Sequence, residues 1–421
     1  MIEQNARLIN EGYGGDFLIS RAEGCTLWDQ HGRQYYDLSM AAGTAILGHA
    51  HPVVQNAIRQ AARSGTLFCR PTTLGQEYVD CLQGFMPWFT HFALCNTGSE
   101  AVARLVRIAR ALTKRTRIGV FAGDWHGSLD TLLVDGDGIE HTYLRSLGTP
   151  MELLDQILLL PYDSPTAFEL IRKHKDELAA VIIEPIQGSL PRDDVGPFLH
   201  ELRAVTSECR VLLAFDEVLT GGRLGLGGVQ EEFKVHADLA TYGKIFGGGL
   251  PIGIVAGTKA TMGFIREPAI RGRYEVGTVI LGGTFSGNPL TLAVGLAVLK
   301  HIKANASQIY SKINSHGNNL RSSVNGFCSK RNLAARMYGV GSICRLVMTA
   351  VPVRSAYERD LYEAPKSVQD KFYSELLSLG VHVAGNRLLL LSEAYSDLEI
   401  EVVTSKFIEA LENYACRENA S

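Results

Sequence analysis

Short runs of almost only apolar residues recur along the chain, and they constrain the fold more than any other sequence feature. Three of them are RIGVFAG at 117–123, AAVIIEP at 179–185 and VLLAFDEV at 211–218. Strands that are apolar on both faces fit a parallel sheet that helices cover on both sides. Stretches with helical spacing separate these runs, as in EAVARLVRIARAL at 100–112. The alternation predicts an α/β fold with a large, doubly wound, mostly parallel sheet.

Changes in this pattern divide the chain into three parts. Residues 1–50 alternate apolar and polar residues around the turn DQHG, and we expect short strands that join a smaller domain. Residues 51–297 carry the alternation of strand and helix and form the large domain. Residues 298–421 show strand character at 337–350 and a last helix in EIEVVTSKFIEALENYA, which predicts a small α+β domain.

Composition excludes several classes of protein. A formal net charge of −3 offers no field that attracts nucleic acid or an anionic membrane. No apolar run approaches the ~20 residues of a membrane span, and the N-terminus lacks the basic start and apolar core of a signal peptide. The eight cysteines include no CxxC pair, which argues against a zinc or disulfide framework and favours a cytoplasmic protein with reduced thiols.

The segment CNTGSEAV at 95–102 precedes a helical pattern and suits an anion. Gly98 allows the backbone to approach a phosphate closely, and we expect Ser99 at the N-cap with unpaired amides behind it. TGSE also fits an ordinary capping box that starts at Thr97. By itself the segment therefore leaves both interpretations open.

Two further residues have ordinary interpretations when taken singly. Asp216 ends an apolar strand, where a carboxylate needs a cation or a helix cap. Lys244 lies in TYGKIFGGGLPIG, between an apolar approach and three glycines, where it is either solvated or reactive. A desolvated lysine has a lowered pKa, and its free amine forms Schiff bases with carbonyls.

Together these features meet the needs of one cofactor, pyridoxal 5'-phosphate. Its phosphate requires an anion site, its pyridine nitrogen an acid, and its aldehyde an amine. Asp216 would keep the ring nitrogen protonated, and Lys244 would carry the aldehyde and then move the substrate proton. Trp125 in GDWHGSLD would stack on the ring, and His126 beside it would orient that loop.

The sequence resembles the class III pyridoxal-phosphate-dependent aminotransferases of fold type I, and within them the glutamate-1-semialdehyde aminomutase branch. The motifs that carry the resemblance follow the family order: AEGCTLWDQHGRQYYDL, ILGHAHPVV, NTGSEAV, WHGSLD, VIIEPIQG, FDEVLTGGR, YGKIFGGGLPIG and GGTFSGNPL. The resemblance implies that Lys244 is the Schiff-base lysine and that Asp216 partners the pyridine nitrogen.

It also implies the remaining contacts of the cofactor. Gly98 and Ser99 would hold the phosphate, and Trp125 and Val218 would cover the two faces of the ring. Thr284 would reach the phosphate in the neighbouring subunit, so we expect a homodimer with shared active sites. The family usually has Tyr or Phe where this chain has Trp125.

Departures from the family pattern bear on the substrate. Ser189 stands where enzymes that use glutamate as donor carry a Glu, and Leu219 stands where many carry a Gln; both departures resemble the aminomutase branch. Arg7 is offset by one residue from that branch's carboxylate-binding Arg, and GNRLLLLS lacks its Glu and supplies Arg387. We expect Arg7 or Arg387 to grip a substrate carboxylate or phosphate, with a surface charge as the alternative for Arg387. The substrate then differs from glutamate semialdehyde.

We therefore favour an aminotransferase that moves an amino group between a donor and a keto or aldehyde acceptor by a ping-pong Schiff-base route. An intramolecular aminomutase and a racemase or epimerase are the alternatives, and a non-catalytic cofactor-holding scaffold is a remote one. Residues 127–150 are glycine-rich and polar, and we expect a mobile lid there. His49 and His51 form no metal pair in this family, and without a third ligand in view we expect no metal.

Overall fold

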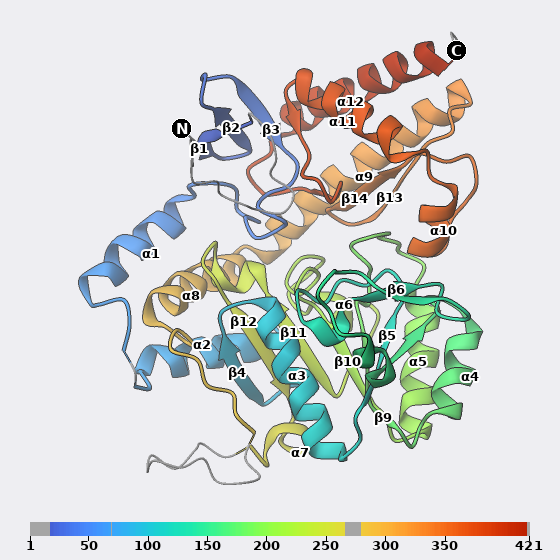
Figure 1. The fold of residues 1–421 in the computed structure, drawn as a ribbon. Coiled ribbons are helices and arrows are strands. Elements are labelled where there is room, and N and C mark those ends of the chain that lie inside the picture. Colours follow the sequence, from blue (N-terminus) through green and yellow to red (C-terminus); the bar gives the residue numbers. More distant parts are fainter. Residues whose placement is uncertain (1–16, 69, 266–278, 419–421) are drawn as a thin grey trace, which may run out of the picture.

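The computed structural model describes residues 17–68, 70–265 and 279–418, and a seven-stranded sheet dominates that part of the chain (Figure 1). The strand order is β4-β12-β11-β10-β9-β5-β8. Strands β11, β10, β9, β5 and β8 run parallel, whereas β12 runs antiparallel to both β11 and β4. The sheet is mostly parallel, and the predicted fold class is confirmed. Its strands are β4 (His91–Cys95), β5 (Arg117–Phe121), β8 (Ile157–Leu160), β9 (Leu178–Ile183), β10 (Leu212–Asp216), β11 (Leu239–Gly243) and β12 (Gly253–Gly257).

Both faces of this sheet are buried, which explains why its strands are apolar throughout. Leu213 and Phe215 of β10 enter the hydrophobic cluster on one face, and Ala214 between them enters the cluster on the other. Helix α3 packs its apolar stripe, which includes Leu105 and Val106, on the second face. The helices around the sheet are α2 (Thr73–Gln83), α3 (Gly98–Thr113), α4 (Pro165–Lys173), α5 (Gly196–Glu208), α6 (Gly228–Glu232), α7 (Lys259–Met262) and α8 (Pro289–Ala304).

The N-terminal strands share a sheet with the C-terminal part of the chain. The order is β1-β2-β3-β15, in which β15 pairs parallel with β3. A second small sheet has the order β13-β14-β16. One cluster joins these parts, because Leu38 and Met40 pack with Leu376 and Phe407. The elements are β1 (Ile19–Glu23), β2 (Thr26–Asp29), β3 (Gln34–Asp37), β13 (Arg336–Val340), β14 (Ile343–Val347), β15 (Val381–His382), β16 (Leu389–Leu390), α9 (Ala306–Arg331), α10 (Ala356–Tyr362), α11 (Lys366–Ser378) and α12 (Asp397–Glu418).

Both predicted domain boundaries fall at or next to a helix of the structure. The first, after residue 50, precedes α1 (Pro52–Arg63) by one residue. The second, between residues 297 and 298, lies inside α8, which continues as one helix to a break at Asn305. Figure 1 shows α8 and α9 following each other from the large sheet into the upper domain. The domain ranges themselves stay a prediction.

Two further findings concern the whole described chain. Among the described residues we find no helix with the length and hydropathy that a bilayer crossing requires. Six cysteines are free thiols: Cys25, Cys81, Cys95, Cys209, Cys328 and Cys344.

Helix α9 is the element that the sequence pattern missed. Its 26 residues include two glycines and several Asn and Ser, which are poor helix formers in isolation. Packing explains its stability, since Ile313, Leu320 and Val324 are buried. Gly317 lets the helix lie against the backbone of the β13–β14 turn, because a Cβ there would come within 2.0 Å of the Gly341 carbonyl oxygen.

We expect Gly317→Ala to destabilise the protein by about 1–3 kcal/mol, because the methyl group forces α9 away from this turn. Gly326→Ala in the same helix is the matched control. A Cβ at Gly326 meets nothing within 4 Å, so the change should stabilise the helix by about 0.5–1 kcal/mol. Thermal unfolding of the two variants checks both signs, and equal shifts would contradict the packing argument.

Candidate active site

A cavity of about 400 Å³ lies at the carboxyl ends of the central parallel strands. In open α/β sheets this edge is where ligands bind. Six of the residues predicted from the sequence line it: Gly98, Ser99, Trp125, Asp216, Val218 and Lys244. They come from separate strand ends, so the parallel sheet is what brings them together.

Lys244 directly follows β11 and begins a short 3-10 turn, η3 (Lys244–Gly247). Its backbone has φ +48°, a left-handed conformation that costs a non-glycine residue roughly 1–2 kcal/mol. Gly248 ends the turn at φ +60°, and a Cβ there would come within 2.8 Å of Val298. The glycines therefore let this turn pack tightly against α8 and hold the lysine in the cavity.

The electrostatic surroundings of Lys244 favour a free amine. Burial lowers the pKa of Lys244, and the charge of Arg223 lowers it further. The carboxylates of Glu184 and Asp216 oppose this shift without reversing it. An amine with a lowered pKa is the nucleophilic form that carbonyl chemistry requires.

Asp216 ends β10 and is only 5% exposed. Its Oδ2 lies 2.8 Å from Nδ1 of His126, and its Oδ1 accepts hydrogen bonds from Thr241 and from the amide of Val218. Burial by itself would lower the pKa of His126, but the contacts with Asp124 and Asp216 outweigh burial and raise it to about 10. His126 is thus a buried cation that pairs with Asp216.

Glu184 directly follows β9 and lies in the motif VIIEPIQG, but the sequence predicted no role for it. Its Oε2 accepts a 2.7 Å hydrogen bond from the amide of Trp125, which fixes that loop at the cavity. Burial, together with the charges of Asp124 and Asp216, raises the pKa of Glu184 to about 8. The signal that finds Glu184 is the one that found Asp216: a carboxylate at the end of an apolar parallel strand.

The start of α3 forms a concave backbone surface against Val218. A Cβ on Gly98 would come within 2.9 Å of Val218 Cγ1, so a side chain there would fill the cradle. The predicted N-cap at Ser99 is wrong, because α3 starts at Gly98 and Thr97 caps it by accepting from the amide of Glu100. The hydroxyl of Ser99 instead faces the loop and accepts from the amide of Ser128.

Trp125 is 54% exposed although it lines the cavity. Its ring is thus available to a flat ligand, whereas its backbone is held by Glu184. Val218 lies opposite the start of α3 and is held by the hydrogen bond of its amide to Asp216. The two side chains are those predicted to cover the faces of a pyridine ring, and that role stays a prediction.

Two predicted residues, Thr284 and Arg387, lie apart from the cavity lining. Thr284 is exposed in the turn before α8. Arg387 donates to Gln369 and to Asp370 and lies over the ring of Tyr373, so it would have to leave these partners to reach a substrate. Arg7 lies outside the described residues.

The stretch expected to be a lid has a definite fold. It contains η1 (Asp130–Leu132) and a hairpin of β6 (Val134–Gly136) and β7 (Thr142–Leu144). Arg145 donates to Asp135 and to the carbonyl of Asp124, which ties the hairpin to the loop that carries Trp125. Motion of residues 127–150 stays a hypothesis.

The side chains at the cavity fit pyridoxal phosphate. A bare helix start suits the phosphate, a buried acid suits a protonated ring nitrogen, and an amine of lowered pKa suits the aldehyde. The volume falls within the range of small-molecule sites.

Comparisons with known proteins agree with this fit. Residues 10–411 match the family described as aminotransferase class-III. The chain is 35% identical over 401 residues to the glutamate-1-semialdehyde 2,1-aminomutase of Methanosarcina acetivorans, a match that covers 94% of this chain and 92% of that protein. An omega-transaminase from Sphaerobacter thermophilus has a TM-score of 0.87 at 27% identity, covering 98% of this chain and 94% of its own. A structure described as a transaminase with PLP bound has a TM-score of 0.85 at 28% identity, covering 99% and 95%.

We expect Glu184→Gln to flatten the pH dependence of stability. In the unfolded chain this carboxyl titrates near 4.5, and in the native cofactor-free protein it titrates at about 8. The native state therefore keeps an extra proton between these values. Its contribution to the free energy of unfolding is full below the lower value and falls as pH rises towards 8, by at most about 1.4 kcal/mol per pH unit.

Unfolding of cofactor-free wild type and Glu184→Gln from about pH 5 to about pH 9 measures this difference. Glu201→Gln, at an exposed position of α5, is the control and should follow wild type. Parallel curves for wild type and Glu184→Gln would contradict the shifted pKa.

Proposed function

The chain belongs to the class-III aminotransferase family, and from that premise we propose that it transfers an amino group between an amino donor and a keto or aldehyde acceptor, with Lys244 as the residue that bonds the cofactor. The cofactor of the family is pyridoxal 5'-phosphate. The observation that carries the proposal is the convergence of an amine of lowered pKa, a buried acid and a bare helix start on one cavity. The donor and the acceptor would bind in this one cavity one after the other, which is the order of a ping-pong reaction.

When bound, pyridoxal phosphate supplies an aldehyde for the amine and a ring that accepts electron density from the substrate. The first amides of α3 bind the phosphate, and Gly98 keeps that approach open. Asp216 would hold a proton at the ring nitrogen, and His126 positions the Asp216 carboxyl group for this task through a 2.8 Å hydrogen bond. Lys244 Nζ takes the proton from the substrate carbon and returns it.

The aminomutase is the second candidate, and a specific finding favours it. The curated relative at 35% identity is a glutamate-1-semialdehyde 2,1-aminomutase. Such an enzyme returns the amino group to the same molecule, so it needs no separate acceptor. Leu219 lines the cavity and Ser189 lies close to Gly123, so neither offers the Glu or Gln found in enzymes that use glutamate as donor.

Replacing the lysine tests the proposed chemistry. We expect Lys244→Ala to bind pyridoxal phosphate but to lose amino transfer by at least ~10³-fold, because both the amine and the proton carrier are gone. Lys259→Ala, at the exposed start of α7, is the matched control and should keep full activity. Activity in Lys244→Ala within ~10-fold of wild type would contradict the assignment.

The spectrum of the holoenzyme distinguishes the two candidates. An amine donor added without acceptor should leave the cofactor in its amine form if the enzyme is an aminotransferase. A mutase substrate should return the starting spectrum in the same experiment. Stopped-flow absorbance with a panel of amines and amino aldehydes records which outcome applies.

We further propose a homodimer in which Thr284 contacts the phosphate at the site of the partner subunit. Thr284 and Phe285 support this, since both are exposed and lie outside the cavity of their own chain. A role for Arg387 or Arg7 in holding a substrate anion, and a cytoplasmic location, stay predictions.

Mixing two inactive variants tests the shared site. Thr284→Glu should lose phosphate affinity through charge repulsion, and Lys244→Ala lacks the amine. In a mixed dimer one site combines an intact lysine with an intact threonine, so unfolding and refolding the two chains together should restore activity. No recovery, with size-exclusion chromatography showing mixed dimers, would contradict the shared site.

A further inference from the structure

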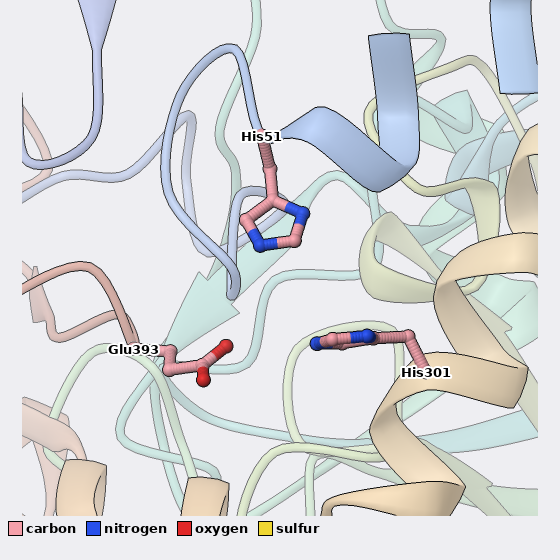
Figure 2. Close-up of side chains that lie close together, drawn as sticks. All are labelled: His51, His301 and Glu393. Atoms are coloured by element: carbon pink, nitrogen blue, oxygen red, sulfur yellow. The ribbon is translucent and has the colours of Figure 1, made fainter. Parts of the chain in front are cut away.

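Three side chains that lie far apart in the sequence converge outside the active-site cavity, as Figure 2 shows. His51 caps the start of α1, His301 lies in the last turn of α8, and Glu393 follows β16. One ligand atom from each lies within 4.8 Å of the other two. We propose that these residues bind a zinc ion that fastens the small domain to the large one.

The donor set selects the kind of ion. Two imidazole nitrogens and one carboxylate oxygen suit zinc, whereas calcium and magnesium prefer oxygen ligands alone. A tetrahedral zinc with bonds of about 2.0–2.2 Å holds its ligand atoms roughly 3.4 Å apart. The most widely separated pair therefore has to close by at most about 1.4 Å, which side-chain rotation supplies. Water completes the fourth position.

The state of the side chains also suits a cation. Glu393 Oε2 is buried and accepts no hydrogen bond from the described residues. The ring centroids of His51 and His301 are 5.3 Å apart at 57°, so the two rings present edges to a common space instead of stacking.

Binding has one local cost. Nδ1 of His51 accepts a long 3.3 Å hydrogen bond from the amide of Val53 at the start of α1. Coordination through Nε2 places a proton on Nδ1 and ends this hydrogen bond. The amide of Val53 is part of the first turn of a helix, where water readily replaces a capping side chain.

The position of the cluster, between the two hydrophobic cores, indicates what the ion would do. Leu391 and Tyr395, on either side of Glu393, pack in the core of the small domain, whereas Val298 in the same helix as His301 packs in the core of the large domain. A second cavity of about 270 Å³ beside His51 shares Thr44 and Gly249 with the active-site cavity. The ion would hold this wall of the active site without touching the substrate.

Zinc titration of the chelator-treated, desalted holoenzyme tests the site. We expect one high-affinity zinc per chain in competition with a chromogenic chelator, and a higher midpoint of thermal unfolding with zinc. Co²⁺ in its place should give the visible bands of a four-coordinate ion. Glu393→Gln, which keeps the side-chain shape, and His301→Asn should each weaken zinc binding at least ~10-fold.

His200→Gln, at an exposed position of α5, is the matched control and should bind zinc like wild type. The cofactor spectrum and the zinc-free midpoint of each variant establish that it is folded. The proposal is overturned if wild type binds no zinc, or if both ligand variants bind it as tightly as His200→Gln does. Amino transfer enters none of these readouts, so the site stands or fails apart from the proposed function.

Discussion

The buried ion pair between Asp216 and His126 is the interaction on which the active site depends. A carboxylate at the end of an apolar strand costs several kcal/mol unless a cation compensates it. His126, with a pKa raised to about 10, supplies that cation, and Asp124 holds its other side at 3.5 Å. The imidazolium thus lies between two acidic side chains, where the protonated ring nitrogen of the cofactor is expected.

Burial and nearby charges also shift the pKa values of the two neighbours of this pair, Glu184 and Lys244. Glu184 is buried and lies beside Asp124 and Asp216, and both effects raise its pKa to about 8. Glu184 and Asp216 raise the pKa of Lys244 by less than burial lowers it, so the pKa of Lys244 stays lowered. A site built in this way separates an acid that is paired with a cation from an amine of lowered pKa, which is what opposite roles on one cofactor require.

Much of the active-site arrangement could be predicted from local sequence, because the residues that follow parallel strands lie together at one edge of the sheet. Asp216 and Lys244 were found by that rule, and Glu184 follows β9 in the same way although its role was missed. The rule does not fix details of helix starts, so the cap fell on Thr97 and not on Ser99. Helix α9 escaped prediction because its stability comes from tertiary packing around Gly317 and not from its own residues. His301 and Glu393 could not be paired with His51, since only the meeting of two domains brings them together.

The central claim is that Lys244 bonds covalently to the cofactor aldehyde. Borohydride reduction of the holoenzyme, followed by proteolysis and mass mapping of peptides, tests it most directly. The account predicts one pyridoxyl label per chain, on the peptide that contains TYGKIFGGGLPIG. A label on any other lysine, or an unlabelled Lys244 in enzyme that retains its cofactor, would contradict it.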